Sequence, residues 1–198
     1  MQLTKSQVRA KIVAARKSLS RTTRDTEAEA LAHHLDEVIA PSSTVCAYVP
    51  VGSEPGSLAL VDGLDRRGVV VLLPVARHDA AGVPEPLRWG RYRREALVAA
   101  PFGLREPGPP WLPADAVATA SVVLVPALAV DRTGVRLGRG AGFYDRTLPL
   151  AGAGVRLVAV VRDDEVVDEL PAEPHDVRMT HVLTPGAGLV PLGATPPL

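Results

Sequence analysis

The sequence predicts an α/β fold, a single three-layer αβα domain built around a mostly parallel, mixed central sheet. Five apolar runs rich in β-branched residues are continuous rather than alternating, which is typical of strands covered on both faces. Helical patterns lie between these runs, so helices can cover both faces of the sheet. The runs are residues 45–49, 69–73, 121–125, 155–161 and 181–183.

Prolines stand at or just beyond the ends of four of these runs: Pro50, Pro74, Pro126 and Pro185. Proline lacks the N–H group that a central strand needs, so these positions predict where the sheet stops. In open α/β sheets, ligands bind beside the loops that leave the carboxyl ends of parallel strands. We therefore expect functional residues just beyond Pro50 and Pro126.

Three helices are expected before and between the first two runs. The first begins at the capping box Thr4–Gln7, the second spans about residues 22–39, and the third follows Pro55, which suits a first helical turn. Apolar residues at one-face spacing predict the buried side of each helix. They are Val8, Ile12, Ala15 and Leu19 in the first, Leu31, Leu35 and Val38 in the second, and Leu58, Val61 and Leu64 in the third.

The chain has 198 residues, enough for one domain with a sizeable core. We expect a single domain over residues 1–198, with its core in about 4–185 and a loose Gly/Pro-rich tail after Pro185. Residues 80–86 predict a turn-rich connection. Residues 101–113 contain five prolines and two glycines beside Phe102, Leu104 and Trp111, which indicates a loop packed on the surface over a site.

Charge and composition limit the partners. Lys and Arg number 22, as do Asp and Glu, so nothing indicates nucleic acid or an anionic membrane. Trp89 and Tyr92 lie among arginines, but balanced charge favours a solvated strand or turn over a nucleic-acid platform. Cys46, in an apolar run, indicates a buried thiol and a reducing compartment. Without a secretion signal or the ~20 apolar residues of a membrane span, we expect a cytoplasmic monomer.

Residues 136–145, RLGRGAGFYD, are the most informative segment of the chain. Glycine at every second position fills no core and costs backbone entropy, which indicates that the main chain approaches a ligand closely. Arg136 and Arg139 add positive charge, Phe143 and Tyr144 an aromatic pair, and Asp145 a carboxylate. Backbone donors and guanidiniums suit a phosphate, and a carboxylate suits Mg²⁺. The run predicts a nucleotide-phosphate site.

Other glycine-rich motifs fit this run less well. A dinucleotide fingerprint needs a glycine where Phe143 stands and follows the first strand, and a Walker loop needs Gly-Lys-Ser/Thr, which the run lacks. A flexible glycine hairpin remains an alternative, although it does not require Arg136, Arg139 or Asp145. A helix that begins at about Phe143 would direct its free N–H groups toward the same anion.

Four further charged residues are candidates for the same site. Lys5 and Arg9 are four apart on the first helix and share one face. Glu54 follows Pro50 closely, and Asp176 precedes the last predicted strand. Each has a simpler interpretation as a solvated side chain or, for Glu54, as an acid favoured in a first helical turn. Their order around the glycine run favours the functional interpretation.

In that order, these motifs resemble the 5-formyltetrahydrofolate cyclo-ligase (5,10-methenyltetrahydrofolate synthetase) family from about residue 4 to 185. The most specific block is residues 136–146, RLGRGAGFYDR, and the next is residues 102–107, FGLREP. The resemblance implies a fold like that of sugar-phosphate isomerases and CoA transferases. It also implies ATP- and Mg²⁺-dependent conversion of 5-formyltetrahydrofolate to 5,10-methenyltetrahydrofolate, with release of ADP and phosphate.

The resemblance further implies roles for individual residues, with Arg139 and Tyr144 catalytic and no nucleophilic side chain required. Asp145 and Asp176 would bind Mg²⁺, directly or through water. The residues implied to bind ATP are Lys5, Arg9, Arg136, Leu137, Gly138, Arg139, Gly140, Ala141, Gly142, Phe143 and Tyr144. Those implied to bind the folate are Val49, Glu54, Phe102, Arg139, Gly140, Ala141, Gly142 and Phe143.

Four residues depart from the family pattern. Ala141 replaces Lys or Gly, Phe143 a frequent Tyr and Thr180 an Asp, and Pro149 shortens the helix after Tyr144. These departures leave open a folate- or nucleotide-binding paralogue without cyclo-ligase activity. Fold analogy alone leaves open a sugar-phosphate isomerase-like enzyme, which would need a carboxylate base beside the phosphate loop and no ATP.

Overall fold

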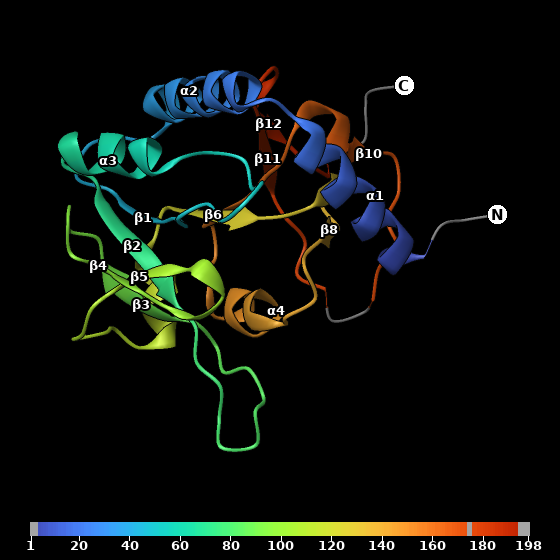
Figure 1. Cartoon of the computed structure of the whole chain (residues 1–198). Coiled ribbons are helices and arrows are strands. Elements are labelled where there is room, and N and C mark those ends of the chain that lie inside the picture. Colours follow the sequence, from blue (N-terminus) through green and yellow to red (C-terminus); the bar gives the residue numbers. More distant parts are fainter. Residues whose placement is uncertain (1–3, 174–175, 194–198) are drawn as a thin grey trace.

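The computed structural model describes residues 4–173 and 176–193. A seven-stranded sheet with the order β12–β11–β9–β6–β1–β2–β3 lies at its centre (Figure 1). The five inner strands run parallel, and β12 and β3 pair antiparallel at the two edges. This confirms the mixed, mostly parallel sheet. The strands are β1 (Thr44–Cys46), β2 (Val70–Val75), β3 (Arg88–Arg91), β6 (Val122–Pro126), β9 (Arg156–Val160), β11 (His181–Thr184) and β12 (Gly188–Pro191).

Helices cover both faces of this sheet. On one face, Val45 and Leu124 belong to a core with Leu31 and Leu64 of two long helices, α2 and α3. On the other face, Cys46 belongs to a core with residues of short helices. Figure 1 shows α2 and α3 on one side of the sheet and α4 on the opposite side. The helices are α2 (Arg21–Val38), α3 (Leu58–Arg66), α4 (Phe143–Thr147) and the 3₁₀ segments Ala114–Thr119, Leu148–Leu150 and Asp163–Glu165.

The first helix, α1 (Lys5–Ser18), packs on a separate three-stranded sheet. That sheet consists of β10 (Val166–Val167), β7 (Ala129–Asp131) and β8 (Arg136–Leu137). Val8 and Ile12 of α1 pack against the cluster that contains Leu137. The predicted capping box forms, with the backbone N–H of Thr4 donating to Oε1 of Gln7 at 2.9 Å. Because β8 leads into the glycine run, this packing places α1 beside that run.

The predictions for the helices were wrong at two positions. Ala15 is exposed, and the neighbouring Arg16 is buried instead, because its guanidinium pairs with the buried carboxylate of Glu165. Pro55 lies outside α3, whose N-cap is Ser57. As predicted, α4 ends before Pro149. None of the helices in the described residues combines the length and the apolar character needed to cross a membrane.

Both edges of the sheet differ from expectation. The tail after Pro185 is not loose as far as residue 193, because β12 pairs antiparallel with β11. Around Trp89, the expected solvated segment is the edge strand β3, and the side chains of Trp89 and Tyr92 are buried. Trp89 therefore belongs to the core and not to a ligand pocket. Pro74 pairs with Trp89 inside β2, so it does not end that strand.

The two irregular segments behave differently. In the turn of residues 80–86, the carboxylate of Asp79 accepts hydrogen bonds from the N–H groups of Ala81 and Val83, as expected for a turn-rich connection. The proline-rich segment starts with a 3₁₀ turn (Pro101–Gly103) and continues as β5 (Arg105–Pro107), which pairs with β4 (Leu97–Ala99). The carboxylate of Glu106 in β5 accepts from the N–H of Ala76, which fixes this hairpin to the end of β2.

Candidate active site

A cavity of about 750 Å³ lies at the carboxyl ends of the inner strands. Its walls come from the loops after β1, β2 and β6, from α1, and from the whole glycine run. Residues just beyond Pro50 and Pro126, where functional residues are expected, therefore border this cavity. Among the lining residues are Val51, Glu54, His78, Ala127, Leu128 and Gly138.

The glycine run forms one wall of this cavity through its backbone. Gly140 and Gly142 have φ angles of +91° and +81°, a region that side chains with a Cβ adopt only under strain. Gly138 differs, because its φ is not positive and a Cβ there would meet no other atom within 4 Å. The first glycine is required neither by backbone conformation nor by packing in the protein. Its absent side chain leaves room for a ligand against the main chain.

The two cations predicted on α1 face the cavity. Nε of Arg9 donates a hydrogen bond to the carbonyl oxygen of Gly138 at 2.9 Å, which holds the helix and the glycine run together. Nζ of Lys5 lies 3.0 Å from Oε1 of Glu173 and 3.9 Å from Oδ2 of Asp176. The shared helix face therefore brings Lys5 and Arg9 to the glycine run, as expected, and not into bulk solvent.

Two further ion pairs cross the same cavity. Arg136 pairs with Asp145, and Nε of Arg139 lies 3.1 Å from Oε1 of Glu54. In each pair, the cation is predicted to bind phosphate and the carboxylate is predicted to bind the metal or the folate. The contact between Lys5 and Asp176 follows the same pattern. Opposite charges at this spacing neutralise each other, so an incoming ligand exchanges one partner for another. The charged residues predicted from separate parts of the chain thus line one cavity.

Asp145 and Asp176 lie on two sides of Arg136. Its Nη2 binds the carboxylate of Asp145, and its Nη1 donates to the carbonyl oxygen of Val177, next to Asp176. Within residues 4–173 and 176–193, no three His, Cys, Asp or Glu side chains gather as a complete metal cage. Two carboxylates beside the glycine run nevertheless fit Mg²⁺, which commonly keeps waters and substrate phosphates among its ligands.

Two tyrosines lie close to Glu54. Burial first, and then the charge of Glu54, raise the pKa values of Tyr144 and Tyr48 well above the usual range. Both hydroxyls therefore stay protonated at neutral pH and can donate hydrogen bonds. The hydroxyl of Tyr48 donates to the carbonyl oxygen of Pro55 at 2.8 Å, which fixes the loop that carries Glu54. Tyr144 borders the cavity directly.

The sequence model of the 5-formyltetrahydrofolate cyclo-ligase family matches residues 1–185. The chain belongs to this family. It is 63% identical to the 5-formyltetrahydrofolate cyclo-ligase of Mycolicibacterium smegmatis over 95% of this chain and 97% of that protein. It is 31% identical to the cyclo-ligase of Escherichia coli over 72% of this chain and 78% of that protein.

Solved structures of the cyclo-ligase family share the fold. The 5,10-methenyltetrahydrofolate synthetase of Aquifex aeolicus is 25% identical and superposes with a TM-score of 0.77, covering 98% of this chain and 95% of that one. The synthetase of Mycoplasma pneumoniae is 17% identical and has a TM-score of 0.70, covering 91% of this chain and 98% of that one.

The remaining cyclo-ligase positions predicted from the sequence fall into three groups. Val49, Ala141 and Phe143 line the cavity, and the ring of Phe143 meets His78 edge-on at 5.1 Å. The side chain of Leu137 is buried against α1, so its contact with the cavity is limited. The side chain of Phe102 lies outside the part of the chain that the structure describes.

The departures from the cyclo-ligase pattern leave most of this site unchanged. Oγ1 of Thr180 accepts a hydrogen bond from the N–H of Leu157 at 2.9 Å, at the start of β11 and outside the cavity wall. Thr180 therefore has a structural role in the sheet. Ala141 and Phe143 are the two departures that border the cavity.

Several lining residues were not predicted from the sequence. The most informative is Arg16, a fully buried arginine in the cavity wall. Arg16 follows Ile12 by four residues on the inward side of α1, but its burial depends on the distant partner Glu165. Tyr48, Glu106 and Glu173 also border the cavity, and all three lie within blocks that resemble the cyclo-ligase family.

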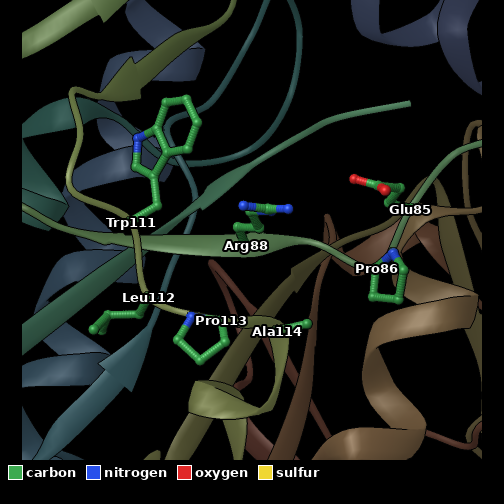
Figure 2. Close-up of a pocket in the computed structure, with 7 residues that line it drawn as sticks. All are labelled: Glu85, Pro86, Arg88, Trp111, Leu112, Pro113 and Ala114. Atoms are coloured by element: carbon green, nitrogen blue, oxygen red, sulfur yellow. The ribbon is translucent and has the colours of Figure 1, made fainter. Parts of the chain in front are cut away.

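A second hollow of about 400 Å³ lies on the outer side of the β3 edge (Figure 2). Figure 2 shows Arg88 on β3 between Trp111 and Glu85, with Leu112, Pro113 and Ala114 along the neighbouring segment. The glycine run and the cations of α1 contribute nothing to its lining. The residues that resemble the cyclo-ligase motifs therefore line the larger cavity and not this hollow.

Proposed function

We propose that this chain catalyses the conversion of 5-formyltetrahydrofolate to 5,10-methenyltetrahydrofolate, consuming ATP and releasing ADP and phosphate. The observation that carries the proposal is the contact between Arg139 and Glu54. Arg139 belongs to the glycine run, and Glu54 belongs to the loop after β1. A phosphate on the run and a pterin on Glu54 would therefore meet within one cavity.

The reaction needs two steps, because an amide oxygen is a poor nucleophile and a poor leaving group. In the first step the formyl oxygen attacks the γ-phosphorus, a new O–P bond forms, and the bond from phosphorus to ADP breaks. In the second step N10 attacks the activated formyl carbon and loses its proton. The bond from carbon to the phosphorylated oxygen then breaks, which releases phosphate and leaves the cyclic methenyl product.

In this proposal, the residues position the substrates and neutralise charge. Lys5, Arg9 and Arg136 hold the phosphates, together with the backbone N–H groups of the glycine run. Arg139 lies between the two substrates and neutralises charge on the transferred phosphoryl group. Tyr144, protonated because its pKa is raised, donates a hydrogen bond within the same cavity. No covalent intermediate with the protein is needed.

The folate is held at the opposite side of the cavity. The carboxylate of Glu54 accepts hydrogen bonds from the pterin amino and N3–H groups, and Val49 and Phe143 contact the ring. Asp145 and Asp176 are the groups that would hold Mg²⁺, which supplies charge neutralisation on the phosphates when bound. We further propose that the protein acts as a monomer.

The direct test supplies purified protein with 5-formyltetrahydrofolate and Mg-ATP and follows the absorbance of the methenyl product. We expect product only when both substrates are present, with one ADP formed for each methenyl group. A folded preparation that binds both substrates but forms neither ADP nor product would contradict cyclo-ligase activity. It would favour a binding paralogue instead.

A further inference from the structure

Arg16 contributes a buried guanidinium with one unused donor group to the cavity wall. Nε and Nη2 each lie 2.6 Å from a carboxylate oxygen of Glu165, and Nη2 also donates to the carbonyl oxygen of Ala127 at 2.8 Å. Only 1% of the residue is exposed. Among the described residues, Nη1 has no hydrogen-bond partner. A buried donor without a partner is costly, so a ligand acceptor there would stabilise the bound state.

Arg16 lies on the same face of α1 as Lys5 and Arg9. The spacings of four and seven residues correspond to about one and two helical turns, so the three side chains form a row along the cavity. Lys5 and Arg9 occupy the end beside the glycine run and Asp176. Arg16 occupies the end beside Ala127 and Tyr48, both of which line the cavity.

A chain of contacts connects Arg16 to the loop that carries Glu54. Glu165, the partner of Arg16, lies 4.0 Å from Nη1 of Arg162. The same Nη1 donates to the carbonyl oxygen of Ser53, next to Glu54, at 3.2 Å. A carboxylate and a guanidinium donor stand on neighbouring parts of the cavity wall, at the side of the cavity where Glu54 would bind the pterin.

The charge of Arg16 is already compensated, which limits what it can bind. Glu165 neutralises Arg16, and Glu27 neutralises the adjacent Arg162 at 2.7 Å. A phosphate would find little net positive charge at this end of the cavity. A neutral carbonyl oxygen, by contrast, needs only the free N–H groups of Nη1.

We propose that Nη1 of Arg16 donates a hydrogen bond to the C4 carbonyl oxygen of the pterin ring. The pterin edge presents an amino group, an N3–H group and the C4 carbonyl in sequence. Glu54 accepts from the first two, and Arg16 donates to the third. This inference rests on the proposed function. It makes Arg16 the residue that senses the C4 substituent and so helps to distinguish a folate from its 4-amino analogue, in which an amino donor replaces the carbonyl oxygen and N3 carries no hydrogen.

The first test needs no variant. Calorimetry measures the affinity of the wild-type protein for 5-formyltetrahydrofolate and for its 4-amino-4-deoxy analogue. Because a donor would then face a donor, we expect the analogue to bind about tenfold more weakly or worse. Equal affinities would overturn the role of Arg16. If 5-formyltetrahydrofolate itself fails to bind, the proposed function fails, and this inference fails with it.

A double variant identifies the donor. Arg16→Gln combined with Glu165→Gln replaces the buried ion pair by a neutral pair, which avoids leaving one charge unpaired. We expect its preference for the folate over the analogue to be at least about threefold smaller than that of the wild type, with Glu54 accounting for what remains, and we expect ATP binding to be unchanged. The matched control is Arg9→Gln, which should weaken ATP binding and keep the full preference for the carbonyl compound. A preference as large as that of the wild type in the double variant would show that another group contacts the C4 oxygen.

Discussion

Arg139 and Glu54 form an ion pair at 3.1 Å between the glycine run and the loop after β1. The side chain of Glu54 is mostly buried, whereas that of Arg139 is 53% exposed. The carboxylate is further fixed by the N–H of Val51, which donates to it at 2.9 Å. Arg139 is thus the more exposed partner of the pair. If a pterin binds Glu54 as proposed, it would compete with Arg139 for the carboxylate.

Arg139→Ala should remove activity without unfolding the protein. Because the Arg139 side chain is half exposed, its ion pair should contribute only about 1 kcal/mol to stability, whereas loss of a group that stabilises transition-state charge costs about 10²–10³ in kcat. Methenyl absorbance and a thermal melt measure the two effects. The control is Arg132→Ala, which breaks a fully exposed pair with Asp168 outside the cavity. Turnover by Arg139→Ala at the rate of this control would rule out the proposed role.

The contribution of Arg16 to the free energy of unfolding should depend on whether its partner Glu165 is present. Removing one member of a buried ion pair costs about 3–5 kcal/mol because the other charge is left uncompensated. Arg16→Gln alone and Glu165→Gln alone should therefore both be strongly destabilised. The double variant should recover part of the loss. Chemical denaturation of the four proteins gives the coupling energy, and strictly additive losses would show that the two charges do not depend on each other.

The sequence was most informative where one local rule decided the structure. Continuous apolar runs predicted the five parallel strands, because strands covered on both faces need no polar alternation. The edge strands were predicted less well for the opposite reason: β12 was missed, and β3 was expected only as a solvated strand or turn. They are short, lie in Gly- and Pro-rich segments, and form only because a neighbouring strand offers free backbone groups. That pairing is a tertiary effect that no local pattern records.

In the candidate site, too, residues that follow a local sequence rule were predicted, and residues that depend on tertiary contacts were not. The spacing of its glycines made the run at 136–145 recognisable, and Lys5 and Arg9 could be placed because four residues make about one helical turn. Arg16 was not placed, because its partner Glu165 is distant in sequence. A charge on an apolar helix face has no meaning until the fold supplies the opposite charge. The three ion pairs of the cavity were likewise unpredictable as pairs.

Cys46 should be unreactive in the folded protein and should make stability fall at high pH. Burial raises the pKa of its thiol from 9.0 to about 12. The unfolded chain loses this proton above pH 9, while the native state keeps it up to about pH 12. The free energy of unfolding should then decrease by about 1.4 kcal/mol for each pH unit in that window.

Thiol labelling checks this expectation. At pH 8 the wild type should react with a disulfide reagent at least about a hundredfold more slowly than the same chain in denaturant, since only the exposed thiolate reacts. In Cys46→Ala, the stability slope between pH 9 and 12 should be shallower than in the wild type. Rapid labelling of the native protein would contradict the buried position of the thiol.

Gly138→Ala should separate ligand binding from folding at the glycine run. Its φ is not positive, and the added methyl group would meet no protein atom within 4 Å, so the free energy of unfolding should stay within about 1 kcal/mol of the wild type. The methyl group would instead project where a phosphate approaches the main chain, and we expect the affinity for ATP to fall about tenfold. Gly63→Ala is the matched control. Gly63 lies within α3, where a Cβ also meets nothing within 4 Å, and it stands outside the cavity. Gly63→Ala should raise the stability slightly, because alanine favours the helix, and should leave the ATP affinity unchanged.

The two variants are compared by their affinity for ATP. If Gly138→Ala binds ATP as tightly as Gly63→Ala, the phosphate does not lie against the first glycine of the run.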